Sequence, residues 1–381
     1  MPSATRVCPD CLRRWLRCMT IPRLLLRMRH GGLACAFGKT RGRSMRLGAI
    51  AHRAALWIEE GWHRLRRRKP PEAPVLDAYR GFAVPGGLVL RGRVLAALRR
   101  TTPDPGQSRW QNLREIVSLF LTHEVAQVPV VVAGGEGRAI SDEEGYVWLE
   151  VAGSFAPGWA EVELEIEGKP ETRTTFRAMV PDPEARLGIV SDIDDTMLET
   201  GAYSLARNLW TTFTGSARTR RIFPDAIVLM DHLSEHGRNP VWYVSSSPWN
   251  LHAFLDKVFD RAGLTIGPMF LRDLGLSQDG FLAGGHGAHK GDAIDRIIRA
   301  NPGLSFVLVG DTGQHDAEIY LEACHRHAGR IAAVILREPG PGPDDASRAA
   351  IASIRRLGVV VVHGPDFSAV AGALERAGLL V

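Results

Sequence analysis

The chain has 381 residues, of which 45% are hydrophobic and 23% are charged, proportions typical of a globular protein and not of a disordered one. Its net charge of +5 is uneven: residues 1–44 hold nine Arg and one Lys against one acid, and the rest carries 37 basic and 41 acidic residues. Because that remainder is not basic, we expect no nucleic-acid partner. It contains no apolar run of about 18 residues, so the sequence predicts no membrane-spanning helix.

Residues 1–44 are interpreted as a poorly ordered basic leader, with translation from Met45 as an alternative and a targeting leader as another. Four of the five cysteines lie in this leader and only Cys324 lies outside it, so the rest of the chain has no disulfide framework. We therefore expect a reducing, cytoplasmic location. A zinc site at the CPDC motif of residues 8–11 stays open beside chance cysteines.

Residues 45–70 are predicted to form an amphipathic basic helix. Apolar residues recur at helical spacing from Leu47 onward, and a basic run leads into Pro70, which ends the helix. An apolar face beside a basic terminus would let residues 45–69 lie on an anionic membrane surface, which would make the protein peripheral at the membrane. Packing on the folded body, with the arginines solvated, is the alternative.

Residues 76–180 are predicted to form a small antiparallel, sandwich-like β domain. Short β-rich runs separated by Gly and Pro occur at 86–95, 128–132, 145–151, 159–167 and 172–180. Residues 109–124 have helical spacing instead. No cluster of His, Cys and Asp indicates a catalytic centre in this block, so we expect a structural or binding role for it.

Residues 186–381 show a different pattern, in which buried strands alternate with helices. Continuous apolar runs at 187–192, 240–246, 267–273, 305–311, 331–338 and 359–364 alternate with helical stretches at 226–237, 250–263, 291–301, 316–329 and 367–378. Such runs are typical of strands buried on both faces, so we predict the α/β class with a Rossmann-like parallel sheet. In these sheets, ligands bind beyond the carboxyl ends of the strands.

Two acids stand at the end of the first of these strands, in the stretch GIVSDIDDTMLET. Asp192 and Asp194 are two residues apart, and in extended chain such residues point the same way. Both carboxylates are therefore expected to face one site, where their repulsion requires a cation or a proton. Asp195 should point away from that site, and Glu199 should lie in a lid or in solvent.

Further polar residues follow the other strands. Ser245 ends the run at 240–246, Asp311 ends the run at 305–311 with Asp316 five residues on, and Lys290 opens a helix between those two strands. Acids at two strand ends, a hydroxyl at a third and a nearby lysine suit Mg²⁺ and phosphate together, because Mg²⁺ prefers oxygen ligands.

Four motifs in this order resemble the haloacid dehalogenase superfamily of phosphotransferases: D-x-D-x-T at 192–196, a strand-end Ser, a Lys, and G-D-x-x-x-x-D at 310–316. The segments VSDIDDTML, YVSSSPWNLH, GAHKGDAI and VLVGDTGQHDAEIY are similar to the actin-patch phosphatidate phosphatase family known from yeast, and the β-rich block before them is similar to its bacterial subgroup. The resemblance covers roughly residues 76–340. It implies that 186–381 is a haloacid dehalogenase-like catalytic domain.

The resemblance implies a Mg²⁺-dependent phosphomonoesterase that works through an aspartyl-phosphate. Asp192 would be the nucleophile and Asp194 the general acid and base. Lys290 would pair with the phosphate and restrain Asp192. Oxygen atoms that would hold Mg²⁺ belong to Asp192, Asp194 (through its backbone carbonyl), Asp311 and Asp316.

Substrate contacts are expected from Ser245 and Ser246, and Thr196 is expected to order the loop beside them. The gaps between the motifs hold no full cap domain, although residues 200–222 have room for a small lid. An open site suits a phosphate on a bulky molecule, and the resemblance implies phosphatidate. Two alternatives stay open: a phosphatase for protein, nucleic-acid ends or soluble phosphomonoesters, and a membrane-associated binding protein whose phosphatase activity is secondary.

Overall fold

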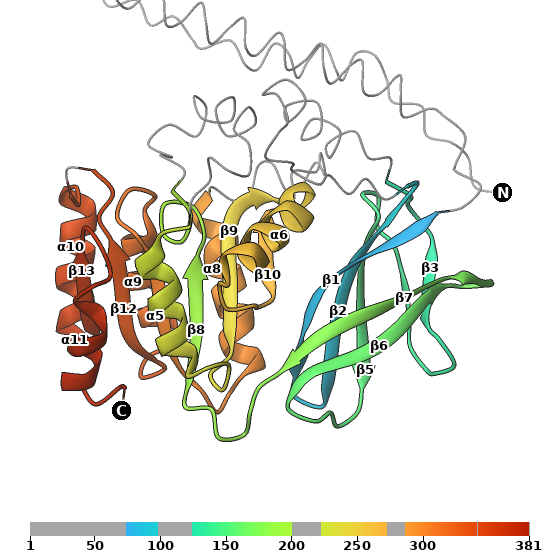
Figure 1. The fold of residues 1–381 in the computed structure, drawn as a ribbon, viewed down its shortest axis with the longest axis horizontal. Helices are drawn as coiled ribbons and strands as arrows, with labels where there is room; N and C mark the ends of the chain where they lie inside the picture. Colours follow the sequence, from blue (N-terminus) through green and yellow to red (C-terminus); the bar gives the residue numbers. More distant parts are fainter. Residues whose placement is uncertain (1–73, 98–123, 200–221, 273–285, 341, 381) are drawn as a thin grey trace, which may run out of the picture. The chain divides into compact units, whose positions relative to one another are not determined.

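Two β-sheets organise the described part of the chain in the computed structural model (Figure 1). The structure describes residues 74–97, 124–199, 222–272, 286–340 and 342–380, which all belong to one compact unit. Four predictions lie outside these residues: the leader at 1–44, the helix at 45–70, the helix at 109–124 except its last residue, and the lid at 200–222 except its last residue.

The first sheet has seven strands in the order β4–β3–β6–β7–β1–β2–β5. They are β1 (Val75–Val84), β2 (Gly87–Leu95), β3 (Pro129–Val132), β4 (Arg138–Ile140), β5 (Tyr146–Ala152), β6 (Gly158–Ile166) and β7 (Lys169–Val180). All neighbours are antiparallel except β1 and β7, which are parallel. The described β block is therefore one mixed sheet, where a wholly antiparallel domain was expected. Neither β1 nor β4 was predicted, because a bulge between Tyr79 and Phe82 breaks the alternation of β1 and β4 is only three residues long.

The second sheet has six strands in the order β10–β9–β8–β11–β12–β13. They are β8 (Leu187–Asp192), β9 (Val241–Pro248), β10 (Met269–Arg272), β11 (Ser305–Asp311), β12 (Ile331–Arg337) and β13 (Val360–Gly364). Every neighbouring pair is parallel. The predicted α/β class and its parallel sheet are confirmed.

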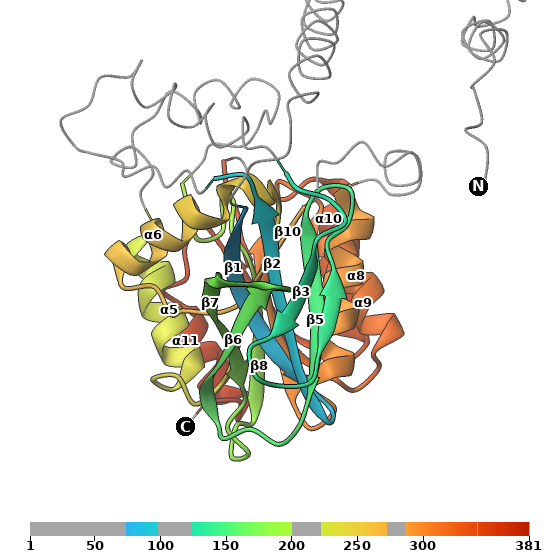
Figure 2. The same cartoon turned by 90° about the vertical axis from the view of Figure 1, so that its right-hand side faces the viewer.

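Helices cover both faces of the parallel sheet. They are α5 (Pro224–Ser234), the 3-10 turn η1 (Trp249–Leu251), α6 (His252–Ala262), α8 (His286–Ala300), α9 (Asp316–Arg326), α10 (Asp345–Arg356) and α11 (Val370–Arg376). Figure 2 shows α5, α6 and α11 on one side and α8, α9 and α10 on the other. Ile189 of β8 packs in the core that includes residues of α5, α6 and α11, and Val190 packs in the core that includes residues of α8, α9 and α10. The two residues lie on different faces because successive side chains of a strand point to opposite sides. The continuous apolar runs thus bury both faces, as predicted.

Helix α10 was not predicted from the sequence. Its N-cap residue Asp344 accepts a hydrogen bond from the Ser347 backbone N–H at 2.8 Å, and Ala350, Ile351 and Ile354 are buried. An aspartate cap followed by apolar residues three and four apart is a recognisable helix signal. The helix was missed because small residues and arginines dominate its sequence.

The seven-stranded sheet packs on the α/β part of the chain through aromatic side chains of β1. Tyr79 stacks on Trp249 with ring centroids 4.7 Å apart, and Phe82 lies against Phe270 with centroids 5.4 Å apart. Such pairs contribute to stability beyond the area that they bury. Trp249 is therefore a packing residue, and aromatic contacts join the two sheets beside η1 and β10.

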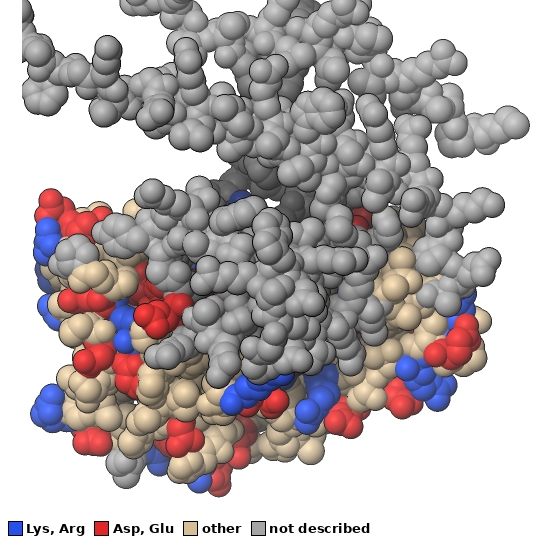
Figure 3. Space-filling view, turned by 45° about the horizontal axis from the view of Figure 1, so that its top comes forward, with Lys and Arg blue, Asp and Glu red and all other residues tan. Residues whose placement is uncertain are grey.

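The surface of the described residues carries both signs of charge. Figure 3 shows acidic and basic side chains intermingled over the coloured part of the face that it presents. Among the described helices, none combines the length and the apolar character that crossing a bilayer requires.

Candidate active site

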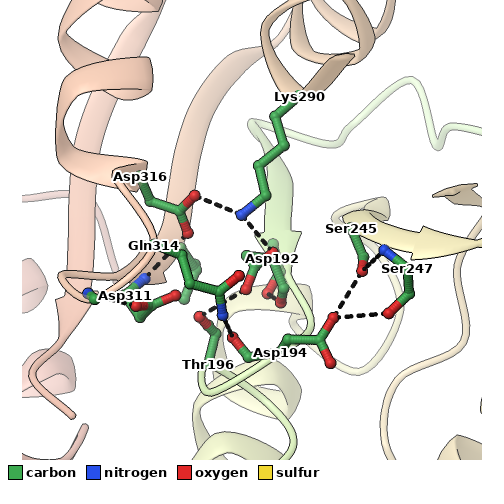
Figure 4. A network of polar contacts seen from close by, with 12 residues as sticks. Asp192, Asp194, Thr196, Ser245, Ser247, Lys290, Asp311, Gln314 and Asp316 are labelled. Carbon is green, nitrogen blue, oxygen red and sulfur yellow. Dashed lines mark hydrogen bonds and ion pairs between the residues drawn. The ribbon is translucent and has the colours of Figure 1, made fainter. Parts of the chain in front are cut away.

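The parallel sheet brings the predicted polar residues to one edge. Asp192 ends β8 and Asp311 ends β11, and these strands are neighbours. Ser245 lies near the end of β9, on the other side of β8. Lys290 belongs to the start of α8, and Asp316 is the first residue of α9. Figure 4 shows these side chains converging at the carboxyl ends of the strands, where α/β sheets bind ligands.

Three of the acids form a buried cluster with the lysine, which we call the acid–lysine cluster. Carboxylate oxygens of Asp192, Asp311 and Asp316 all lie within 4.8 Å of one another. The Lys290 ammonium lies 2.7 Å from Asp192 Oδ1 and 2.5 Å from Asp316 Oδ1. All four side chains are buried. One ammonium cannot balance three carboxylates at such depth, so the cluster would carry an excess of negative charge if all three were ionised.

Burial and the closeness of the carboxylates shift the pKa values of the cluster. Burial raises the pKa of Asp192 to about 8; Lys290 opposes this shift, and Asp316 and Asp194 add to it by repulsion. Burial and the nearby carboxylates of Asp316 and Asp192 raise the pKa of Asp311 to about 9. The pKa of Lys290 is raised despite burial, because Asp192 and Asp316 stabilise the ammonium. The Lys290 ammonium is therefore charged at neutral pH, but further positive charge would be needed to ionise Asp192 and Asp311 there.

The donor set of the cluster fits a divalent cation. Asp311 Oδ1 accepts a hydrogen bond from the Gly313 N–H at 2.6 Å, but Asp311 Oδ2 is buried and has no hydrogen-bond partner. Asp316 Oδ2 accepts from the Asp311 backbone N–H at 3.2 Å. A buried carboxylate oxygen without a partner is costly. Several carboxylate oxygens at this spacing are ligands that Mg²⁺ accepts.

Asp194 is not a member of this cluster of carboxylates, and the extended geometry that was expected to align it with Asp192 is not observed. β8 ends at Asp192, so the extended geometry on which the prediction relied does not continue to Asp194. Instead, Asp194 Oδ2 accepts hydrogen bonds from the hydroxyls of Ser245 and Ser247, each at 2.9 Å. Asp195 is buried and has a left-handed backbone, with φ of 57°.

The structure places Ser247, and not Ser246, beside the predicted acid–base residue. Because β9 continues to Pro248, Ser245 and Ser247 share one side of the strand and Ser246 faces the other. The period-two rule could have identified this pair from the sequence. Thr196 lies close by, and its hydroxyl donates to Asp192 Oδ2 at 3.1 Å. It therefore orients the Asp192 carboxylate as well as ordering the loop.

Two further residues shape the site. The Gln314 side-chain amide donates to the backbone carbonyl of Asp194 at 3.0 Å, although nothing in a single sequence separates Gln314 from other polar loop residues. Gly310 allows α9 to approach β11, since a Cβ there would lie 2.6 Å from Asp316 Oδ2 and 2.7 Å from the Tyr320 hydroxyl oxygen. The absence of a side chain at the glycine of the G-D motif is thus required for steric reasons.

The parallel sheet makes this chain an α/β protein. The buried acid–lysine cluster at the carboxyl edge of that sheet forms a candidate site suited to phosphate and a divalent cation. Residues 187–338 match a family model described as "Phosphatidate phosphatase APP1, catalytic domain". That segment covers both acid motifs, the strand-end serines and Lys290.

Two curated relatives extend the match. The chain is 26% identical to phosphatidate phosphatase APP1 of Saccharomyces cerevisiae over 238 residues, which are 59% of this chain and 40% of the yeast protein. It is 30% identical to an uncharacterised protein of Schizosaccharomyces pombe over 157 residues, which are 40% of this chain and 25% of that protein. The chain thus spans less than half the length of the curated relatives it matches. The similarities support a relationship to phosphatidate phosphatase-like phosphoric monoester hydrolases.

Proposed function

We propose that the chain is a Mg²⁺-dependent phosphomonoesterase of the haloacid dehalogenase superfamily, in its bacterial phosphatidate phosphatase subgroup. Its substrate would be phosphatidate, which it would convert to diacylglycerol and phosphate. The acid–lysine cluster carries this proposal, because three clustered carboxylates against one ammonium suit a divalent cation beside a phosphate. The similarity of residues 187–338 to a phosphatidate phosphatase catalytic domain supplies the choice of substrate.

Asp192 is the nucleophile in this mechanism. Thr196 contacts its Oδ2 and Lys290 contacts its Oδ1, so both oxygens of the carboxylate are held in place. One oxygen attacks phosphorus, a new O–P bond forms, and the bond to the diacylglycerol oxygen breaks, which leaves an aspartyl-phosphate. Lys290 would also pair with oxygens of the transferred phosphoryl group.

Asp194 is the general acid and base. Its Oδ2 is held by the hydroxyls of Ser245 and Ser247, which leaves Oδ1 to exchange a proton. Oδ1–H protonates the departing diacylglycerol alkoxide, and the resulting carboxylate then takes a proton from the water that hydrolyses the aspartyl-phosphate. The two serines thus position the acid–base residue, and Ser245 would also contact the phosphoryl group.

Asp192, Asp311 and Asp316 would hold Mg²⁺, and the Asp194 carbonyl, which Gln314 contacts, is the further candidate ligand. When bound, the ion neutralises phosphate charge, so that an anionic nucleophile can approach phosphorus. The protein's own part is to bury three carboxylate oxygens within 4.8 Å of one another, which places the ligands before the ion binds.

A lipid substrate would place the enzyme at a membrane surface. The proposal therefore includes a cytoplasmic enzyme that associates peripherally with an anionic membrane through residues 45–69. These residues lie outside the described part of the chain, so the argument for them rests on their apolar face and basic run.

The test compares phosphate release from phosphatidate in mixed micelles with release from soluble phosphomonoesters at matched concentration. We expect a clear preference for the lipid, loss of activity on chelation of Mg²⁺, and loss of activity in Asp192→Asn with the circular dichroism spectrum unchanged. Glu199→Gln, which removes an exposed acid of the same segment, is the matched control and should keep activity.

Each part of the proposal has its own contrary outcome. A preference for soluble esters would overturn the lipid substrate and favour the soluble-ester alternative. Turnover that survives chelation would overturn the metal requirement. An Asp192→Asn variant as active as Glu199→Gln would remove Asp192 from the role of nucleophile.

A further inference from the structure

Arg91 of β2 is a buried cation without a counter-ion in the described part of the chain. Its side chain is 2% exposed. Nη2 donates to the Arg80 carbonyl at 2.5 Å, but Nε and Nη1 are buried without hydrogen-bond partners. The guanidinium lies 4.4 Å from the ring centre of Phe270 and 5.5 Å from that of Trp148, and these contacts offset part of its desolvation. Unpaired donors of a buried cation remain costly.

Two other groups from α8 face the same region. The Arg296 guanidinium lies 4.9 Å from the ring centre of Trp148 and forms no ion pair with the described residues. The Nε2 atom of His289 is buried and has no hydrogen-bond partner. These two residues are seven positions apart, and therefore on the same side of the helix. Burial and the nearby charge of Arg296 lower the pKa of Arg91 to about 9, which still leaves it charged at neutral pH.

Arg91, His289 and Arg296 all line one cavity of about 270 Å³. This volume lies just below the roughly 300–1,000 Å³ that is usual for small-molecule pockets. Aromatic rings, including those of Tyr79 and Trp148, form much of its wall. The cavity lining includes no member of the acid–lysine cluster, so the cavity is distinct from the candidate active site.

Two carboxylates also line the cavity, and neither neutralises the arginines. Asp142 Oδ1 accepts hydrogen bonds from the backbone N–H groups of Glu144 and Tyr146, so it is committed to a turn. Asp292 is exposed and makes no ion pair within the described residues. Arg91 therefore keeps two unpartnered donors in the wall of the cavity, and a ligand with several acceptor oxygens would satisfy them.

We propose that this cavity binds the phosphate group of a small phosphorylated molecule or of a phospholipid head group. Guanidinium groups match phosphate in geometry as well as in charge. The two arginines suit the doubly charged form of a phosphomonoester, whereas its singly charged form keeps one proton that it can donate to His289 Nε2. The aromatic wall would enclose the organic part of the ligand. Because the active-site carboxylates are not involved, this second phosphate site does not depend on the proposed function.

The test is a calorimetric titration of glycerol 3-phosphate into the 381-residue chain that carries Asp192→Asn, in the absence of Mg²⁺, so that the ligand is not hydrolysed. We expect saturable binding that Arg296→Gln weakens by about tenfold or more, as is typical for the loss of a charge-assisted contact. Arg299→Gln is the matched control. It removes a cation one turn further along α8 whose side chain is 74% exposed and which does not line the cavity.

Further variants separate this site from the catalytic one. Arg91→Met should abolish binding, provided that a thermal melt shows that the variant is folded. If Arg91→Met does not fold, the result for Arg296→Gln at the exposed position decides between the outcomes. Binding lost in Lys290→Met but kept in Arg296→Gln would place the phosphate in the acid–lysine cluster and overturn the proposal. Equal weakening of binding by Arg299→Gln would also overturn the proposal, since the loss of affinity would then follow from the net charge of the protein and not from a contact in the cavity.

Vesicles distinguish the two sources of phosphate. The same variants are sedimented with phosphatidylcholine vesicles that contain phosphatidate. Arg296-dependent binding of glycerol 3-phosphate supports a site for small phosphorylated molecules. Arg296-dependent binding of the vesicles alone supports a site for a lipid head group. Absence of Arg296-dependent binding in both arms overturns the proposal. Phosphate release is not measured in either arm, so failure here is separate from failure of the proposed function.

Discussion

Replacing Lys290 by Met tests the acid–lysine cluster most directly. The ammonium is 2.7 Å from Asp192 Oδ1 and 2.5 Å from Asp316 Oδ1, and the side chain is 4% exposed. Methionine keeps much of the unbranched side chain and deletes the charge. The variant therefore leaves three buried carboxylates without the ammonium that now lies between two of them.

Removing one partner of a buried ion pair costs about 3–5 kcal/mol of unfolding free energy. Because the pKa of Asp192 is already raised to about 8, proton uptake relieves part of the repulsion, so we expect a loss near the lower end, about 3 kcal/mol. The effect on catalysis should be at least as large. Loss of a group that stabilises developing transition-state charge lowers kcat by roughly 10²–10³-fold.

The assay combines urea unfolding with phosphate release by folded protein. Arg299→Gln, an exposed cation on the same helix, is the control and should change neither quantity by more than about 0.5 kcal/mol. Folded Lys290→Met with kcat within about threefold of the unchanged chain would refute the reasoning, because a lysine in contact with the nucleophile cannot be catalytically silent in the proposed mechanism.

Two further variants test the contacts around the site and the packing beside it. Ser247→Ala should lower kcat about tenfold, because it deletes a hydrogen bond to a carboxylate. Ser245→Ala should not simply add to it in the double variant, since both hydroxyls contact Asp194; strictly additive losses in steady-state kinetics would contradict this coupling. Burial, with two nearby arginines, lowers the pKa of His252 to about 3. Below about pH 6.5 the unfolded chain therefore binds a proton that the folded chain does not, and stability should fall by about 1.4 kcal/mol per pH unit down to about pH 3. His252→Phe should remove this slope in urea titrations between pH 7 and pH 5, and unchanged slopes would contradict the assignment.

The parallel sheet could be predicted from sequence because its strands are buried on both faces. The predicted runs at 187–192 and 305–311 coincide with β8 and β11, since uninterrupted apolar residues leave no ambiguity about their extent. β1 was missed for the opposite reason, as its alternation is broken at a bulge. Its partner β7 lies far along the chain, so no local pattern shows the parallel pairing between them.

Ligands of parallel α/β sheets bind beyond the carboxyl ends of the strands. This rule located most of the candidate site, because it requires no knowledge of long-range contacts. It identified Asp192, Ser245 and Asp311 from their place after apolar runs. It could not identify Gln314, whose contact with the Asp194 carbonyl joins residues 120 positions apart. Arg91 was missed as well, because in the sequence it looks like an ordinary polar residue of an alternating strand. Only the packing of β2 against α8 and β10 shows that it is buried.

The environments of the two acids in D-x-D-x-T give a physical reason for their different roles and for the proposed metal. Asp192 is buried beside Lys290, whereas Asp194 is half-buried and held by two hydroxyls. A nucleophilic carboxylate must be ionised, yet burial, which Lys290 only partly offsets, raises the pKa of Asp192 to about 8. Lys290 is therefore not enough to keep this acid ionised at neutral pH, and a divalent cation among Asp192, Asp311 and Asp316 would lower its pKa. In the proposed mechanism the ion is thus needed to prepare the nucleophile as well as to bind phosphate.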